Sequence, residues 1–470
     1  MGLSNFSFVF LGAKNPFQCV LPNGTIIDNK CSTECTEYIP STRYHSYAFD
    51  WGIICDQGKL SGIQVAHMSG LFIGAIFVGH MADRLGRLPI LYASTVLICI
   101  FNLLTIFVPN ATIFMVITCL GGIACQGAGL MSYNIILELV GPSYRAFAGI
   151  FEQIIYAIGI AILALMAFLL PIWTQLALAI AFFGPPAVLI MLPFHIESIR
   201  WQASQPNSRE KVLKGLRYVL KVNGHSYEDH AEMIEQWLAT EQGAEIPVED
   251  LETEKVALLR SCPRRPVKRD SVWDLLKEPM TLKWLVFLCV AWFVNAACYY
   301  GSTIEAGEAF SNPFLGLALS GLIEIPAHCL SPFLMNRFGR RRFHAFMMIF
   351  SGIFFLLVWP LSFLDEVVIY VVFTAAKLCC SMAFASAYVY ASELFPTSVN
   401  SAAIGFCLTI GRFGAVVSPL VLPLGRAPAS LIFGVFITLG GLQALLLRET
   451  LNQSVPLTMT DLRESKLQRI

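Results

Sequence analysis

The nine-residue stretch Gly79-His80-Met81-Ala82-Asp83-Arg84-Leu85-Gly86-Arg87 is the most informative part of this sequence, and it joins two long apolar segments. Its glycines permit a tight turn, its aspartate can cap a helix, and its arginines can pair across the loop. A membrane loop on the positively charged side would explain the arginines but not the spacing G-x-x-x-D-R-x-G-R. A degenerate copy, Asn336-Arg337-Phe338-Gly339-Arg340-Arg341-Arg342, follows about 250 residues later. The chain therefore contains an internal repeat, and two parallel halves are typical of transporters.

Composition places most of the chain in a membrane. The 470 residues are 56% hydrophobic and 14% charged, with a formal net charge of zero, whereas soluble domains carry about 25% charged residues. Nearly half of the charges lie between Glu197 and Lys283. These values exclude a soluble enzyme and give no reason to expect nucleic-acid binding. The sequence contains no phosphate-binding G-x-x-x-x-G-K-[ST] loop, nucleophile constellation or metal cluster, so we expect no enzyme activity, metal or cofactor.

Eleven apolar stretches are long enough to span a lipid bilayer. They cover residues 61–81, 89–108, 112–135, 147–168, 172–193, 283–303, 312–334, 343–364, 367–390, 401–423 and 428–447. The predicted fold is an all-α membrane protein of two pseudo-symmetric helix bundles. Its predicted parts are a cysteine-bearing segment with a stub of a first span (1–60), an N-terminal bundle (61–195), a central loop (196–282), a C-terminal bundle (283–447) and a tail (448–470).

The distribution of Lys and Arg predicts the orientation, because cytoplasmic loops are enriched in these residues. Arginines follow the first, third, seventh and eleventh stretches, whereas the loops near 109–111, 169–171, 304–311 and 365–366 contain no Lys or Arg. Only Arg426 breaks the pattern. We therefore expect a multi-pass plasma-membrane protein with residues 1–60 outside and the central loop and tail in the cytoplasm. Part of the central loop, from Arg209 to Lys221, has helical spacing of apolar residues and can form a membrane-surface helix or a solvated linker.

Four cysteines, Cys19, Cys31, Cys35 and Cys55, lie in the polar N-terminal segment. They fit two disulfides in an oxidising compartment, with three connectivities open. The alternative is a zinc site that uses the Cys31-x-x-x-Cys35 spacing. The sequon that begins at Asn23 favours disulfides, because it predicts a glycan on a segment outside the cell.

Three charged residues, Glu324, Lys377 and Arg412, lie near the middle of their apolar stretches. Charges at this depth cost about 2.5–3.5 kcal/mol on insertion scales and therefore indicate a functional site. Helical spacing places Lys377, Phe384 and Tyr388 on one face. We predict a central substrate site, with Tyr133, Tyr299 and Tyr388 as the main aromatic candidates and Tyr156, Trp292 and Tyr300 as further ones. The alternative is a structural ion pair that ties two helices together.

The first copy of the repeat resembles the signature loop of the major facilitator superfamily. Four further segments resemble the organic ion transporter family, which includes organic cation, carnitine and organic anion carriers; they begin at Glu138 (E-L-V-G-P-S-Y-R), Glu197 (E-S-I-R-W), Glu393 (E-L-F-P-T) and Arg448 (R-E-T-L). The resemblance covers nearly the whole chain. It implies gating-loop roles for Asp83, Arg84, Gly86, Arg87, Glu138, Arg145, Glu197, Arg200, Arg337, Arg340 and Glu393.

The superfamily pattern has twelve spans, one more than the eleven stretches counted here. Residues 7–13 resemble the outer end of the family's first span, but two helical turns reach only roughly 10 Å across a core of roughly 30 Å. We therefore expect an incomplete first span. The alternative is an eleven-span protein whose N-terminus lies outside.

By resemblance, the predicted function is transport of small organic ions through alternating access. Glu324 matches an E-x-P-A segment of cation and carnitine carriers, and Arg412 stands where anion and carnitine carriers tend to have arginine. The net mid-span charge of +1 favours an organic anion or a carnitine-like zwitterion over a simple cation. Two alternatives are a sugar-porter-like carrier, which needs polar amides in its cavity, and a non-transporting membrane scaffold.

Overall fold

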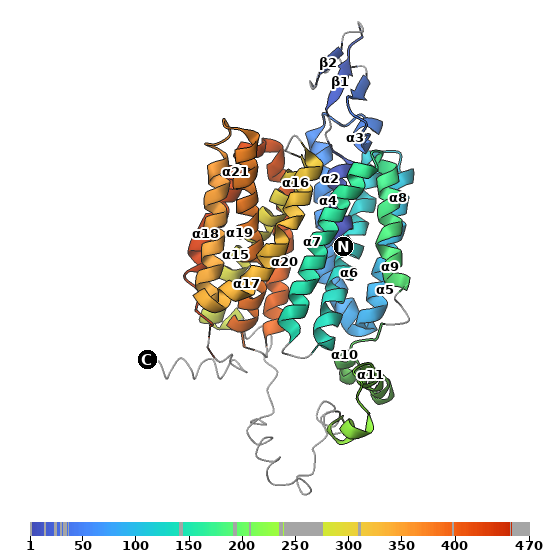
Figure 1. Ribbon diagram of the computed structural model, residues 1–470, viewed down its shortest axis with the longest axis vertical. Coiled ribbons are helices and arrows are strands. Elements are labelled where there is room, and N and C mark those ends of the chain that lie inside the picture. The colour runs from blue at the N-terminus through green and yellow to red at the C-terminus, as the bar shows by residue number, and fades with distance from the viewer. Residues whose placement is uncertain are drawn as a thin grey trace.

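The protein is a bundle of long apolar helices arranged in two groups that stand side by side (Figure 1). The computed structural model describes residues 2–13, 16–22, 26–28, 31, 35, 37–140, 144–190, 195–205, 208–234, 238, 276–308, 312–396, 399–451 and 453. Within these ranges, eleven helical segments are long and apolar enough to cross a membrane. They correspond one for one to the eleven predicted stretches. The prediction of an all-α, multi-pass membrane protein is therefore confirmed.

The first group, the N-half, contains five membrane-spanning segments. These are α4 (Gln57–Leu85), α5 (Arg87–Leu104) with the 3-10 turn η1 (Thr105–Phe107), α6 (Ala111–Leu139), α7 (Arg145–Leu169), and α8 (Trp173–Phe183) with α9 (Pro185–Ile190). Side-chain caps begin two of them. The carboxylate of Asp56 accepts a hydrogen bond from the Lys59 amide at 3.0 Å, and Asn110 accepts one from the Ile113 amide at 3.0 Å. The Lys59 contacts lower the pKa of Asp56.

The second group, the C-half, contains six membrane-spanning segments. These are α15 (Pro279–Glu308), α16 (Pro313–Leu322) with α17 (Glu324–Phe338), α18 (Arg340–Val358), α19 (Glu366–Leu394), α20 (Asn400–Val421) with η6 (Leu422–Leu424), and α21 (Arg426–Ala444). The span from 313 to 338 is broken at Ile323, so Glu324 begins the second helix. This break places a carboxylate at a helix N-terminus, where the helix dipole favours negative charge.

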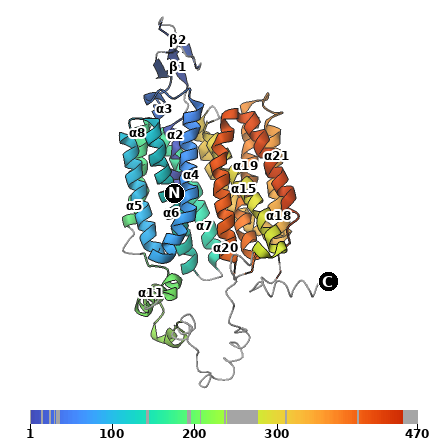
Figure 2. The same cartoon turned by 180° about the vertical axis from the view of Figure 1, so that it is seen from behind.

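Two pairs of elements join the halves. Helix α20 packs on α4, and α16 and α17 pack on α7. Figure 2 shows α4 and α20 along the seam between the bundles.

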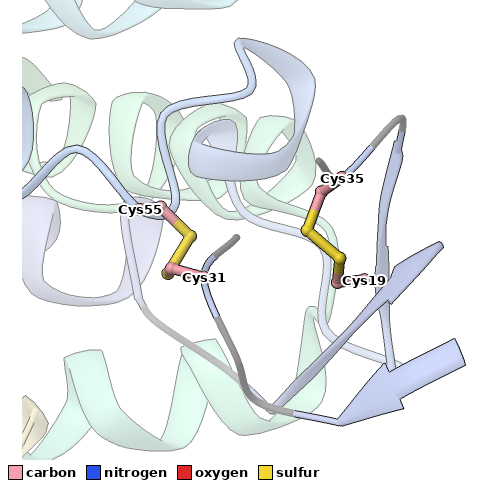
Figure 3. The surroundings of a disulfide bond; sticks show 4 residues. All are labelled: Cys19, Cys31, Cys35 and Cys55. Atoms are coloured by element: carbon pink, nitrogen blue, oxygen red, sulfur yellow. A yellow bond between two sulfur atoms is a disulfide. The ribbon is translucent and has the colours of Figure 1, made fainter. Parts of the chain in front are cut away.

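A small antiparallel sheet stands above one end of the N-half, called the sheet end below (Figure 1). Its central strand β1 (Phe17–Val20) pairs with β2 (Ile26–Asp28) on one side and β3 (Glu37–Pro40) on the other. Disulfides join Cys19 to Cys35 and Cys31 to Cys55 (Figure 3). The four cysteines thus form two disulfides in one of the three open connectivities. The second disulfide ties this segment to the residue next to the α4 cap.

The N-terminal residues are buried inside the bundle. Short helices α1 (Gly2–Asn5) and α2 (Ser7–Leu11) lie between longer helices, and the N-terminus is at mid-height (Figures 1 and 2). Phe6 and Val9 are fully buried. The residues that resemble the outer end of a first span therefore occupy a core position.

The opposite end of the bundle, called the loop end below, carries α10 (Ile199–Ser204), α11 (Arg209–Val222) and η4 (Glu228–His230) (Figure 1). Val212 of α11 is fully buried against Ala203, Ile234 and Leu238. This cluster provides a protein partner for the apolar face that the sequence predicted for α11. Residues 239–275 of the predicted central loop, most of the predicted tail and the sequon at Asn23 lie outside the described residues.

Candidate functional site

Two of the three mid-span charges form an ion pair inside the C-half. The Nζ atom of Lys377 on α19 lies 3.1 Å from Oε1 of Glu324 on α17, and both side chains are at most 1% exposed. The Tyr299 hydroxyl donates to Oε2 of the same carboxylate at 2.8 Å. The geometry matches the structural alternative, an ion pair that ties two helices together.

Lys377 is also held by α15. Its ammonium donates to the Tyr299 carbonyl at 3.2 Å and to the Thr303 hydroxyl, and it lies 3.5 Å from the centre of the Tyr299 ring. A buried ammonium with a carboxylate, two oxygen acceptors and an aromatic face is well compensated. The pair therefore joins three helices, α15, α17 and α19.

Arg412 on α20 is placed differently. Its guanidinium donates to the Tyr300 hydroxyl and lies 5.6 Å from the centre of that ring. The phenols of Tyr388 in the C-half and Tyr156 in the N-half are within its electrostatic range. Among the described residues, no carboxylate lies within ion-pair distance of Arg412. A cation without a carboxylate partner therefore lies where the two halves meet.

Aromatic rings connect the two charged groups. The Tyr299 ring stacks on Phe384 at a centroid distance of 5.2 Å, and Trp292 contacts Tyr388 at 4.6 Å. Tyr133, on α6 of the N-half, reaches Tyr388 at 6.5 Å. The predicted aromatic candidates Tyr133, Tyr299 and Tyr388 thus belong to one cluster, which spans both halves.

At the loop end of the N-half, the signature stretch forms an ion-pair network. Arg87 contacts Asp83 at 2.7 Å and Glu138 at 3.6 Å. The carboxylate of Glu197 accepts hydrogen bonds from the backbone amides of Arg87 and Leu88 at 3.1 Å each. It therefore caps the N-terminus of α5, where unpaired amides and the helix dipole favour an anion.

The C-half repeats this arrangement. Arg340 contacts Glu393 at 3.1 Å and donates to Asn336 at 2.6 Å. Glu449 accepts hydrogen bonds from the backbone amides of Arg340 and Arg341 at 2.8 Å and 3.4 Å, at the N-terminus of α18. Burial tends to raise the pKa of Glu449, but these hydrogen bonds and those from the Thr450 and Leu451 amides lower it overall.

Glycine is required at the turn of both copies. Gly86 and Gly339 have φ values of +105° and +91°, a region that residues with a Cβ rarely adopt. A Cβ on Gly86 would lie 2.6 Å from Glu197, and a Cβ on Gly339 would lie 2.6 Å from Glu449. The two halves therefore use the same turn, cap and ion pair.

Not every predicted gating residue belongs to these networks. Arg84 and Arg337 are exposed beside them. The side chains of Arg145 and Arg200 lie outside the described part of the structure. The remaining predicted gating residues, Asp83, Gly86, Arg87, Glu138, Glu197, Arg340 and Glu393, all lie at the two symmetric turns.

Two residues of the site were absent from the predicted set of site residues. Glu449 could have been assigned from the repeat, because it follows the last span as Glu197 follows the fifth. Tyr300, the partner of Arg412, was only one of several aromatic candidates. Its neighbour Tyr299 turns to the ion pair instead, and sequence spacing does not distinguish two adjacent tyrosines.

The profile of the Major Facilitator Superfamily matches residues 56–419. The chain belongs to this superfamily. Within it, the chain belongs to the organic ion transporter family, because "Solute carrier family 22 member 15-like" of Xenopus laevis is 31% identical over 94% of this chain and 88% of that protein. The "Organic cation transporter protein" of Drosophila melanogaster is 29% identical, covering 96% and 87% of the two chains. "Organic anion transporter 3" of Oryctolagus cuniculus is also 29% identical, covering 97% and 80%.

A solved structure supports the superfamily fold. The inward-open xylose transporter XylE from E. coli aligns with a TM-score of 0.64 and 14% sequence identity, covering 97% of this chain and 96% of that one. At this identity, the similarity shows the fold alone.

Proposed function

We propose that this member of the organic ion transporter family carries small organic ions across the plasma membrane by alternating access. The halves would rock around the aromatic cluster between them. Arg412 carries the proposal, because this cation lies between the halves with phenols around it and no carboxylate partner among the described residues.

The charge balance of the site favours substrates that bear a carboxylate. Glu324 is neutralised by Lys377 and bound by Tyr299. Arg412 therefore supplies the uncompensated charge, and a guanidinium binds a carboxylate through two parallel hydrogen bonds. The aromatic rings beside it can pack against the apolar part of an organic anion or hold the amine of a zwitterion.

Surface-normalised uptake of one organic anion, one zwitterion and one simple cation tests this proposal. Arg412→Lys keeps the charge but loses the two-point geometry, so uptake of the anion and the zwitterion should fall about tenfold. Arg412→Asp should shift the preference toward the cation. The exposed Arg84→Lys variant is the control and should transport all three at the parent rate. Equal losses for all three substrates at normal surface levels would remove Arg412 from substrate selection. If the parent chain transports none of them, the scaffold alternative gains support.

The sugar-porter alternative has weaker support. A sugar carrier binds its substrate through neutral polar groups, whereas the described site between the halves centres on Arg412. Uptake of labelled hexoses and pentoses beside the organic ions distinguishes the two functions.

The proposed orientation places the sheet end outside the cell. The two disulfides suit an oxidising compartment, and the arginine-rich turns at Gly86 and Gly339 suit the cytoplasm. Asn23 should then carry a glycan, and Asn23→Gln should increase gel mobility after expression in glycosylating cells. Asn110→Gln is the control, because the Asn110 side chain caps α6 at the membrane surface. Unchanged mobility of the Asn23 variant would contradict this orientation.

A further inference from the structure

A pocket of about 410 Å³ lies at the sheet end, between the two halves. One wall is the start of α4, with Gln57, Ser61 and Gln64, and the opposite wall is η6 with its flanking residues. This pocket is separate from the mid-span cluster, because neither Arg412 nor the Glu324–Lys377 pair lines it. Its volume falls within the range of about 300–1,000 Å³ that small-molecule sites occupy.

The pocket contains one acidic and one basic side chain from different helices. Glu305, near the end of α15, is only 3% exposed. Arg426, the first residue of α21, is half-buried. A buried carboxylate requires compensating charge or hydrogen bonds, and an arginine fork suits a carboxylate ligand.

Arg426 is also the residue that departs from the charge pattern of the chain. The other short loops at this end, near 109–111, 169–171, 304–311 and 365–366, contain no Lys or Arg. Membrane orientation therefore does not account for this arginine. Its position on the wall of a pocket that also contains Glu305 offers a specific role.

We infer that this pocket is an entry site that binds small zwitterions, with the ligand's carboxylate on Arg426 and its amine directed toward Glu305. The amides of Gln57 and Gln64 add hydrogen-bonding groups, and Tyr47 and Phe8 add aromatic surface. The inference rests on the proposed function, since an entry site serves a carrier. A zwitterion fits better than a simple ion because it matches both side chains at once.

A protection experiment tests the site without requiring transport. Pro423→Cys introduces a thiol on the pocket wall, whereas Leu424→Cys introduces one on the next residue of η6, which does not line the pocket. Intact cells that express the full chain are treated with a membrane-impermeant methanethiosulfonate, and the parent chain gives the background. The probes are glycine, γ-aminobutyrate and 6-aminohexanoate, which differ in the separation of their two charges, beside acetate and tetramethylammonium.

We expect one or more zwitterions to slow labelling of the Pro423→Cys thiol and to leave the Leu424→Cys thiol unaffected. At about nine times the Kd, only a tenth of the sites remain open, so labelling should slow about tenfold. Arg426→Gln or Glu305→Gln, each combined with Pro423→Cys, should abolish this protection while labelling without ligand stays unchanged. Acetate and tetramethylammonium should protect much less.

Three results would overturn the inference. These are no protection by any zwitterion, equal protection of both thiols, and protection by a simple ion as strong as that by the best zwitterion. Uptake measured in the same cells separates this result from the proposed function. Protection without uptake would contradict the carrier function and keep the site, whereas uptake without protection would do the reverse.

Discussion

Lys377 and Glu324 are both fully buried, yet each has several compensating neighbours. The ammonium contacts a carboxylate, a carbonyl, a hydroxyl and a ring face, and the carboxylate also receives the Tyr299 hydroxyl. A buried ion pair contributes little net stability, because desolvation offsets the attraction. The pair is nevertheless costly to break, since removal of one partner leaves the other charge buried alone.

Lys377→Met should therefore destabilise the folded protein by about 3–5 kcal/mol. The double variant Lys377→Met with Glu324→Leu should be closer to the parent, because it leaves no buried charge. Thermal unfolding of the purified protein in detergent measures both. The control is Lys59→Met, which removes the exposed 3.2 Å pair with Asp56 and should change stability by less than about 1 kcal/mol. A double variant as unstable as the single one would contradict this explanation.

The sequence predicts which residues are charged at mid-span but not how they pair. Glu324, Lys377 and Arg412 were identified because charges are rare in apolar stretches. Their partners come from other helices, and the break at Ile323 sets the depth of Glu324. An uninterrupted apolar stretch from 312 to 334 gives no sign of that break, so the pairing of Lys377 could not be derived.

At the scale of the element, the starts of α5 and α18 share one design. In each, a glycine with positive φ allows the turn, and a glutamate that follows a later span caps the new helix. The carboxylate occupies the space where a glycine Cβ would lie. This design explains why the two sequence copies keep the glycine and the arginine after it.

Gly86→Ala should destabilise the protein for two reasons, the unfavourable φ of +105° and the contact at 2.6 Å with Glu197. We expect a loss of about 1–3 kcal/mol and a lower melting temperature. Gly79→Ala is the matched control, because a Cβ there meets its nearest listed neighbour, Leu130, at 3.9 Å inside helix α4. If both variants melt at the same temperature, the turn does not need its glycine.

The Glu449 cap should give the C-half a dependence on acid pH. Because backbone hydrogen bonds lower its pKa in the folded state, the carboxylate contributes stability fully above its ordinary value of 4.5. This contribution should disappear as the pH falls through the lowered pKa. Glu449→Gln should be less stable than the parent at neutral pH, and the difference should shrink below pH 4.5. Melting temperatures of both proteins across this range measure the effect, and a constant difference would contradict it.

Secondary structure was predictable where hydrophobicity alone determines it. The eleven spans follow from length and composition. The strands β1 to β3 were not predicted, because they are short, lie in a polar segment and are fixed by the Cys19–Cys35 and Cys31–Cys55 disulfides. The connectivity of those disulfides depends on the pairing of the strands, which the spacing of the cysteines leaves open.

At the scale of the whole molecule, an aromatic clasp joins the halves at the sheet end. Phe314 on α16 of the C-half lies among three rings of the N-half and its N-terminal segment. The centroid distances are 4.6 Å to Tyr44, 5.2 Å to Phe10 and 5.8 Å to Phe168. Nearby, Val9 of α2 packs so closely on α15 that a Cβ on Gly307 would lie 2.4 Å from it. These contacts close the sheet end in the structure described.

Alternating access requires this clasp to separate whenever the sheet end opens, so weakening it should shift the population toward open states. Phe314→Ala removes a ring whose aromatic contacts are worth about 0.5–1.5 kcal/mol each beyond area burial. Loss of one to two such contacts should raise the open population about tenfold, since 1.4 kcal/mol corresponds to a factor of ten. Val9→Cys reports this opening, because Val9 is fully buried and cysteine is of similar size. Labelling of Val9→Cys by an impermeant thiol reagent should accelerate about tenfold in the Phe314→Ala background. Phe363→Ala is the matched control, since Phe363 is also in the C-half but 93% exposed, and it should leave the rate unchanged. If Phe314→Ala does not accelerate labelling, the clasp does not hold the halves together.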